Sequence, residues 1–568
     1  MRMMAAVGFT CLAAAWTVLD AAAEPRQAVT THRDMVVAAN PLAAQAGLDI
    51  LRAGGNAIDA AVAVQMVLNL VEPQSSGIGG GGYLLYYDGK SHALEAYDGR
   101  ETAPSAATED MFLHADKTPM KFYEAVVGGL SVGVPGDLRL LEAVHKAHGK
   151  LPWAQLLQPA IDLADKGFAI SPRLHDELAD DEYLPKQPTA AAYFYQADGT
   201  AKPAGTLLQN PAFAETLRTI ARDGADAFYK GKIADDIAKA VQGSLQQPGR
   251  LTAADLAAYA AKQRDPVCAP YRIWRVCGTP PSSSGGIAVL QILKLLERFD
   301  LAAMVPGSTP AVHLFAEAGR LAYADRDRYL GDPDVVSVPT AGLLDEAYLR
   351  DRSAVIAPDR DLGKAAAGTP KQQTGWAAPA PQFEPPSTSH ISIVDADGDA
   401  VSFTTSIESA FGSRQMVDGF LLNNELTDFA FQPERDGQPV ANRVGPGKRP
   451  RSSMAPTMVF DASGRLLLVI GSPGGPQIIP FVAKTLIAVL DWHLDPQAAV
   501  DLPNFANRNG ATELEQGTAL EALAPALREM GHDVKIEDMN SGLAAILVTP
   551  DGLVGGADSR REGVAVGD

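Results

Sequence analysis

Thr388 stands where a polar, proline-rich stretch meets a run typical of a β-strand. The stretch KQQTGWAAPAPQFEPPS (371–387) lacks periodicity and is predicted to be an exposed linker, whereas SHISIV follows Thr388 directly. A threonine hydroxyl is a weak nucleophile that needs an adjacent base. A cut between Ser387 and Thr388 would place a new α-amine, with an ordinary pKa of about 7.7–8.0, beside that hydroxyl. These residues therefore suit covalent catalysis by an N-terminal threonine.

Thr388 belongs to one of several separated segments rich in residues that could bind or activate a substrate. The segments are YDGRETAP (97–104), TSHISIVDADGDAVSFTTSIESAFGS (388–413), LLNNELTDF (421–429), KRPRSSMAPT (448–457) and GSPGGP (471–476). In this order and spacing, and together with GIGGGGY (77–83) and PPSSSGG (280–286), they resemble the γ-glutamyltranspeptidase family of N-terminal nucleophile hydrolases. The resemblance extends from about residue 40 to the C-terminus.

The resemblance implies a catalytic role for four residues. Thr388 would be the nucleophile, exposed by autocatalytic cleavage after Ser387. Ser406 stands where the family commonly has a threonine that supports the nucleophile, and its hydroxyl keeps the hydrogen bond. Gly474 and Gly475 match the family's oxyanion-hole glycines, whose backbone N–H groups stabilise negative charge on the attacked carbonyl oxygen.

The resemblance also implies a pocket of mixed charge for a γ-glutamyl group. Arg100 matches the arginine that binds the donor α-carboxylate, where bidentate geometry favours Arg over Lys. Ser452 and Ser453 resemble the hydroxyl pair that holds the same carboxylate. The residues that would accept from the α-ammonium are Glu425, Asp428 and, at a position that is Asn in some members and acidic in others, Glu408.

The implied fold is a four-layer αββα sandwich of the α/β class with an additional helical region. The implied precursor is cut into a large subunit (24–387) and a small subunit (388–568) that remain a heterodimer. The implied reaction moves the γ-glutamyl group of glutathione and other γ-glutamyl amides to water, an amino acid or a peptide through a γ-glutamyl-Thr388 ester. The resemblance implies no metal and no organic cofactor.

Two other functions stay open at this point. A cephalosporin/glutaryl acylase on the same fold would differ in not requiring an α-amine on its substrate. A catalytically silent periplasmic protein that binds γ-glutamyl peptides would lack both chain cleavage and amidase activity.

The elements that must position these residues change in character along the chain. Asn40 and Pro41 open a helix that stops at Gly54–Gly55, and Asn56 caps a second, almost wholly apolar helix that we expect to be buried. Later, HISIVDADGDAVSFTTSI predicts a hairpin around an Asp-Gly turn. Further helices are predicted over 137–148, 153–166, 211–223, 287–299 and 310–323, and a strand over 83–87.

Three motifs resemble binding sites but are better explained otherwise. GIGGGG (77–82) satisfies a dinucleotide-binding pattern, yet a helix precedes it and a strand follows, so we expect backbone in close contact with packed structure or substrate. Residues 395–399 lack the glycine position and terminal Glu of a calcium loop and predict a turn. His145 and His148 share a helix face without a third ligand nearby in sequence, which makes a metal site improbable.

The composition limits the possible partners, and the N-terminal residues indicate the compartment. A net charge of −20 and a pI near 4.9 argue against nucleic acid and anionic membranes as partners. Arg2, an apolar run over 5–19 and Ala21–Ala23 predict a signal peptide over 1–23, hence a periplasmic or secreted protein without a membrane anchor. In that compartment Cys268 and Cys277 could pair across two short strands or remain separate small apolar residues.

The loop after Phe429, AFQPERDGQPVANRVGPG, bears on how open the site is. Some members of the resembled family carry a longer segment here, with an aromatic side chain that folds over the donor. The loop contains Phe431 but no Tyr or Trp, so we expect an open site that admits bulky leaving groups. The alternative is that Phe431 closes the pocket by another route.

Overall fold

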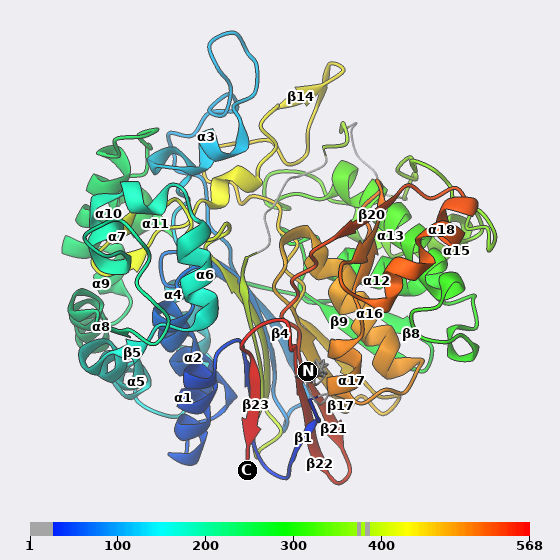
Figure 1. The fold of residues 1–568 in the computed structure, drawn as a ribbon, viewed down its shortest axis with the longest axis horizontal. Coiled ribbons are helices and arrows are strands. Elements are labelled where there is room, and N and C mark those ends of the chain that lie inside the picture. The colour runs from blue at the N-terminus through cyan, green and yellow to red at the C-terminus, as the bar shows by residue number, and fades with distance from the viewer. Residues whose placement is uncertain (1–25, 372–376, 381–386) are drawn as a thin grey trace, which may run out of the picture.

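The computed structural model describes residues 26–371, 377–380 and 387–568, and it contains two large antiparallel sheets stacked face to face. Helices cover the outer face of each sheet (Figure 1). The predicted four-layer αββα architecture is therefore confirmed. The predicted signal peptide lies outside the described residues.

Each sheet has seven strands drawn from distant parts of the chain. The first sheet runs β23 (Val564–Gly567), β2 (Met35–Ala38), β10 (Ser389–Val394), β11 (Ala400–Ser406), β3 (Gly81–Tyr87), β4 (Leu94–Gly99) and β7 (Lys262–Arg264). The second runs β1 (Val29–Thr31), β22 (Gly552–Ala557), β21 (Ala544–Thr549), β17 (Leu466–Gly471), β16 (Thr457–Phe460), β9 (Trp274–Gly278) and β8 (Val267–Tyr271). Both sheets thus combine strands from before and after Thr388.

The central strands, such as β3, β10, β11 and β16, are buried along their whole length, whereas the edge strands β1, β7 and β23 are partly exposed. In β10, Ile391 and Ile393 pack into the core under the helices, whereas Val394 joins the layer between the sheets. That middle layer also contains Met35 and Leu85 from the first sheet and residues such as Met458, Val469 and Ile546 from the second. Successive side chains of a strand point to opposite faces, so one strand supplies both cores.

Helices over the first sheet confirm the predictions closely. In α1 (Pro41–Arg52) the side chain of Asn40 accepts from the backbone N–H of Leu42, and Asn56 caps α2 (Ala57–Val71), all of whose residues are buried. The predicted helices also appear as α4 (Asp137–His148), α5 (Trp153–Lys166) and α8 (Pro211–Asp223). Over the second sheet lie α12 (Gly285–Leu296), α13 (Thr309–Tyr329) and α16 (Ile478–Leu490). Within the described part of the chain, none of the helices has the length and apolar character needed to cross a bilayer.

The linker before Thr388 is partly buried in the residues that the structure describes, although Lys371 and Pro379 are exposed as predicted. Ala378, Ala380 and Ser387 are buried, and Ala378 forms a parallel bridge with Val440. The N–H groups of Ala378 and Ala380 donate to the carbonyls of Pro439 and Asp327, at 3.0 Å each. Small apolar side chains with satisfied backbone groups can be buried without cost, so the prediction of an exposed segment is wrong at these residues.

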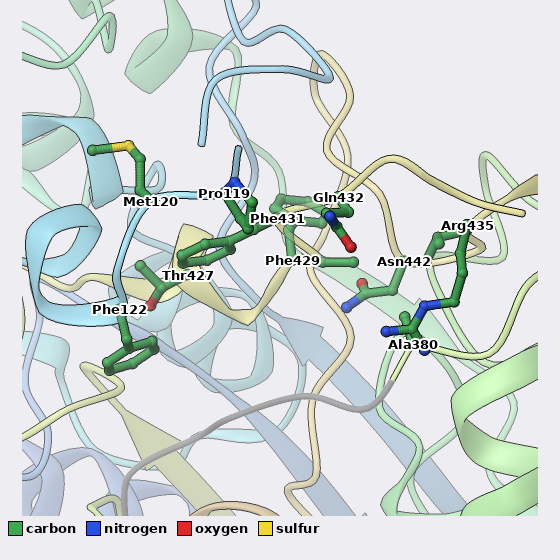
Figure 2. A pocket seen from close by; sticks show the side chains of 12 residues that line it. Pro119, Met120, Phe122, Ala380, Thr427, Phe429, Phe431, Gln432, Arg435 and Asn442 are labelled. Atoms are coloured by element: carbon green, nitrogen blue, oxygen red, sulfur yellow. The ribbon is translucent and has the colours of Figure 1, made fainter. Parts of the chain in front are cut away.

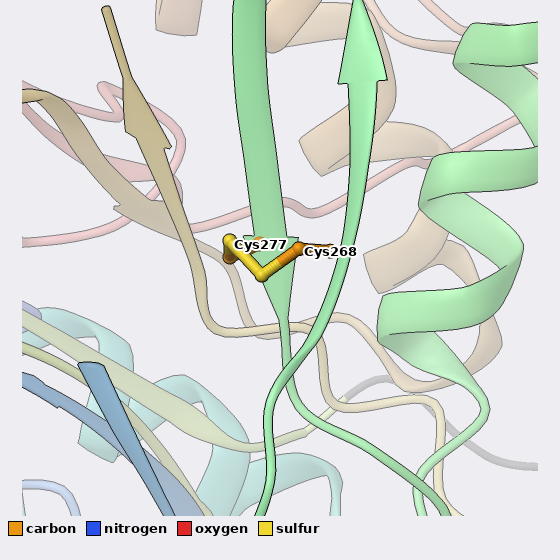
Figure 3. Close-up of a disulfide and its surroundings, with 2 residues drawn as sticks. All are labelled: Cys268 and Cys277. Atoms are coloured by element: carbon orange, nitrogen blue, oxygen red, sulfur yellow. A yellow bond between two sulfur atoms is a disulfide. The ribbon is translucent and has the colours of Figure 1, made fainter. Parts of the chain in front are cut away.

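Two smaller predictions are resolved by the strands and turns. Cys268 and Cys277 lie opposite each other on β8 and β9 and form a disulfide (Figure 3). The Asp395 carboxylate accepts from the N–H groups of Asp397 and Asp399, so residues 395–399 make the predicted hairpin turn between β10 and β11.

Candidate active site

The β10–β11 hairpin brings Thr388 and Ser406 together. The two strands are paired so that Ser389 faces Thr405, which places Thr388 opposite the end of β11. The Thr388 and Ser406 hydroxyl oxygens are 3.1 Å apart, and the N–H of Glu408 donates to the Ser406 oxygen at 2.8 Å. The sequence-predicted hydrogen bond between the Thr388 and Ser406 hydroxyls is therefore present.

The glycine run at 77–82 fixes the position of Ser406. A Cβ added at Gly80 would lie 2.0 Å from the Ser406 carbonyl oxygen, and one at Gly79 would lie equally close to the Leu421 carbonyl. Only glycine permits such close backbone approach. The run therefore packs against protein structure next to Ser406, one of the two explanations that the sequence left open.

The loop between β17 and α16 carries a donor for the carbonyl before Thr388. The backbone N–H of Gly474 donates to the Ser387 carbonyl oxygen at 3.1 Å. Gly474 has a φ of 136° and Gly475 a φ of 57°, both in the region that favours glycine. The loop thus holds an N–H group where negative charge would develop during attack on the Ser387 carbonyl carbon.

Thr388 itself has an unusual backbone conformation. Its φ is +87°, which is strained for a β-branched residue. Arg561 donates to the Thr388 carbonyl oxygen at 3.0 Å from a fully buried position, and burial together with nearby Arg173 lowers the pKa of Arg561 to about 9. Sequence reasoning missed Arg561, because its segment, SRREG, contains no recognisable motif.

His390 is two residues from Thr388 but does not line the same cavity. Its ring nitrogens are 2.8 Å from the Thr404 hydroxyl and 3.1 Å from the Ser392 hydroxyl. Burial lowers the pKa of His390 to about 3, so the ring is neutral at ordinary pH. This histidine therefore belongs to the layer between the sheets.

Arg100 joins the two predicted ammonium-binding acids. Its guanidinium forms buried ion pairs with Glu425 and Asp428, and its Nε donates to the Pro450 carbonyl at 3.2 Å. Burial alone would lower the pKa of Arg100, but these carboxylates hold it well above its ordinary value. Next to them, burial and the Glu425 charge raise the pKa of the Glu101 carboxyl, a neighbour that the sequence did not single out although it lies in YDGRETAP.

The remaining predicted pocket residues are held by polar networks. Glu408 accepts from the side chains of Ser409 and Asn424. The Ser453 hydroxyl accepts from Arg326 at 2.6 Å, and the Ser452 hydroxyl accepts from the N–H of Met454 at 3.1 Å. All of these groups are buried and therefore oriented before any ligand binds.

Every predicted site residue except Gly474 lines one small cavity. Its volume is about 20 Å³, enough for about one water molecule, and Met454 and Ile478 complete the wall. Gly474 faces the same place through its bond to Ser387. The Thr388 hydroxyl, the Arg100 guanidinium and three carboxylates thus line the same cavity, and the Gly474 N–H lies beside it. In this arrangement a hydroxyl oxygen could attack a carbonyl carbon, while the guanidinium and the carboxylates bind a negative and a positive group of the same substrate.

A larger hollow is lined by residues of the loop that follows Phe429 (Figure 2). Thr427 and Phe429 line it, and Asp428 between them lines the small cavity. The hollow has a volume of about 280 Å³, and its wall includes Asn442, whose side chain donates to the Asp428 carbonyl at 2.7 Å. Phe431 stacks on Phe112, with ring centroids 4.6 Å apart, rather than standing alone in the loop. The aromatic side chain is therefore partly buried against a small hydrophobic cluster that includes Phe112, and it also lines the hollow.

Comparison with known proteins identifies the family. The protein-family model described as Gamma-glutamyltranspeptidase matches residues 43–568. The chain belongs to the γ-glutamyltranspeptidase family. It is 39% identical to the glutathione hydrolase proenzyme of Bacillus subtilis (strain 168), over 94% of this chain and 91% of that protein. It is 36% identical to the acylase ACY 1 proenzyme of Pseudomonas sp. (strain V22), over 97% and 96%.

The fold of this family member agrees with a solved structure over nearly its whole length. The cephalosporin acylase from Bacillus halodurans superposes with a TM-score of 0.82 at 29% identity, covering 96% of this chain and 97% of that one. The relatives thus include proteins named as hydrolases and proteins named as acylases, and a shared fold does not distinguish their substrates.

Proposed function

We propose that this protein hydrolyses and transfers γ-glutamyl groups, after cutting its own chain before Thr388. The observation that carries the proposal is the cavity in which Arg100, Glu425 and Asp428 meet the Thr388 hydroxyl. A γ-glutamyl donor carries an α-carboxylate for the guanidinium and an α-ammonium for the acids, whereas a glutaryl group carries no ammonium. The glutathione hydrolase relatives support the same substrate class.

The geometry supports self-cleavage in two steps. The Thr388 hydroxyl oxygen attacks the Ser387 carbonyl carbon, the C–N bond breaks, and the proton passes to the leaving amine, which gives an ester and a free α-amine on Thr388. Water then hydrolyses the ester. The Gly474 N–H stabilises the oxyanion, and the cut removes the strained φ of Thr388, since that dihedral includes the Ser387 carbon.

The freed α-amine then acts as the base for catalysis. It accepts the Thr388 hydroxyl proton while the oxygen attacks the donor amide carbon, and the leaving amine takes that proton as the γ-glutamyl ester forms. Water or the amine of an amino acid or peptide resolves the ester. The donor α-carboxylate would bind Arg100, and the acids that now pair with Arg100 would turn to the α-ammonium. The two pieces would correspond to residues 24–387 and 388–568, in the periplasm or outside the cell.

The test is a denaturing gel and N-terminal sequencing of the purified protein and of Thr388→Ala. Wild type should give two bands, the smaller one beginning at Thr388, and the variant one band of nearly full length. Cleavage of the variant at the same bond would refute the nucleophile assignment. An uncut wild-type chain without amidase activity would instead support a silent binding protein.

The acylase relatives favour a second candidate, hydrolysis of cephalosporin or glutaryl amides on the same site. The α-amine distinguishes the two functions. Equal kcat/KM for γ-glutamyl and glutaryl anilides would favour the acylase, and strong preference for the γ-glutamyl anilide would support our proposal.

A further inference from the structure

Two histidines and a glutamate meet inside the helical layer over the second sheet. His313 and Glu317 stand one turn apart on α13, and His532 comes from the turn between α18 (Ala524–Glu529) and β20 (Val534–Glu537), on the same side of the molecule in Figure 1. All three side chains are buried, and one ligand atom of each lies within 4.8 Å of the others. Imidazole nitrogen and carboxylate oxygen are ligands that Zn²⁺ accepts.

The two rings are held in the way that metal-binding histidines are held. His313 Nδ1 faces His532 Nε2 at 2.7 Å. The other nitrogen of His313 lies 2.7 Å from the Ala357 carbonyl, and the other nitrogen of His532 lies 2.8 Å from the Thr512 hydroxyl. Metal-ligating histidines almost always use their second nitrogen on such a partner, which fixes the ring orientation. Each ring is thus anchored from outside with one nitrogen directed at the cluster.

The glutamate is also fixed by neighbours. Glu317 accepts from Arg320 Nε at 3.1 Å and from the N–H of Leu362 at 2.9 Å. The Arg320 charge opposes a bound cation, but Asp361 lies 3.3 Å from the same guanidinium and balances it. Two carboxylates and one guanidinium leave this region negative before any cation binds.

We propose that His313, Glu317 and His532 bind one Zn²⁺, with water as the fourth ligand. Two Zn–N bonds of about 2.0–2.1 Å in a tetrahedron place the nitrogens about 3.4 Å apart, so the two ring nitrogens, now 2.7 Å apart, must separate by about 0.7 Å. The His532 proton must also change place. The Ala357 carbonyl can only accept, so in the absence of metal His313 carries its proton on Nε2 and its Nδ1 accepts from His532 Nε2. His532 Nδ1 then accepts from the Thr512 hydroxyl. On zinc binding, the His532 proton moves from Nε2 to Nδ1 and is donated to the Thr512 hydroxyl oxygen. The protein therefore releases no proton at this ring.

The site has a structural consequence for the cut protein. His313 and Glu317 precede the Ser387–Thr388 bond and His532 follows it, so the ion would join the two pieces directly. Zinc binding itself does not depend on the cut or on the proposed activity, since none of the three residues lines the Thr388 cavity as described.

The experiment uses the purified full-length protein, stripped with a chelator and dialysed. We expect one Zn²⁺ per chain in competition with a chromophoric chelator, a Tm that rises on zinc addition, and visible Co²⁺ absorption typical of tetrahedral geometry. His532→Gln and Glu317→Gln should lose stoichiometric binding, and Thr512→Val should weaken it about 10-fold through the outer contact. The control is His148→Gln, since His148 lies 2.9 Å from Glu95 in a histidine–carboxylate pair outside this cluster.

Two results would overturn the proposal. One is a wild-type protein whose Tm does not change on zinc addition and which retains no zinc. The cluster would then be a hydrogen-bonded network only. The other is His532→Gln binding zinc as tightly as wild type. If His532→Gln fails to fold, the wild-type Co²⁺ spectrum decides, because absence of tetrahedral bands refutes the site without any variant.

Discussion

Replacing Asp428 with Asn tests whether this carboxylate recognises the donor ammonium. The side chain is 5% exposed and contacts Arg100, so the substitution keeps its shape and removes one buried charge. A hydrogen bond to a charged group contributes about 1.5–3 kcal/mol, which corresponds to about 10- to 150-fold in kcat/KM. We therefore expect Asp428→Asn to lower kcat/KM for a γ-glutamyl anilide by a factor in this range.

A glutaryl anilide separates this effect from a general loss of Arg100 orientation. It presents a comparable carbonyl without the ammonium, so the ratio of the two kcat/KM values isolates the contact in question. The kcat/KM for the γ-glutamyl anilide divided by that for the glutaryl anilide should fall by the same 10- to 150-fold in Asp428→Asn. Asp491→Asn is a matched control, since Asp491 forms a buried pair with Arg272 at 3.0 Å at the far end of α16. It should lower Tm and leave the ratio unchanged. An unchanged ratio in Asp428→Asn would refute the assignment.

Three further outcomes are expected. Arg100→Lys should raise KM for a γ-glutamyl anilide while two bands still form on a denaturing gel, because lysine cannot bind the donor α-carboxylate bidentately; an unchanged KM would contradict its role. Replacing Cys268 and Cys277 with Ser should lower unfolding stability by about 2–3 kcal/mol, measured in denaturant, since their separation of 9 residues closes a short loop; equal stability would show that the bond contributes nothing. A long γ-glutamyl peptide should be cleaved with kcat/KM within about 10-fold of glutathione because of the hollow beside Asp428, and strong rejection would show a covered site.

Residues close together in the sequence were enough to predict many of the helices and strands. Asn40–Pro41 and Asn56 fixed the starts of α1 and α2, and the Asp-Gly turn fixed the β10–β11 hairpin, because caps and turns depend on residues close in sequence. The pairing of β2 with β23 could not be predicted in this way. It joins residues near 36 and 565, and no periodicity in either segment encodes its partner.

The site shows the same division. Residues within quoted motifs, such as Arg100 and Asp428, were found because several motifs agreed in order. Arg561 was missed, since its contact with Thr388 depends on the fold of the last residues and on no local pattern. The burial of Ala378 and Ala380 was missed because composition describes a segment's polarity but not its contacts with distant residues, here Pro439 and Asp327.

The strand order of the first sheet has a consequence for when the chain can be cut. β10 and β11 lie between β2 and β3, so residues 26–387 made alone would have a two-strand gap in the middle of this sheet. Residues 388–568 made alone would leave both edges of that hairpin unpaired, and unpaired edges promote aggregation. Neither piece can therefore be expected to fold by itself. Pieces that are synthesised separately should reach the folded state only when they are refolded together. Assembly of the sheet must come first, and any cut before Thr388 then acts on a protein that is already complete.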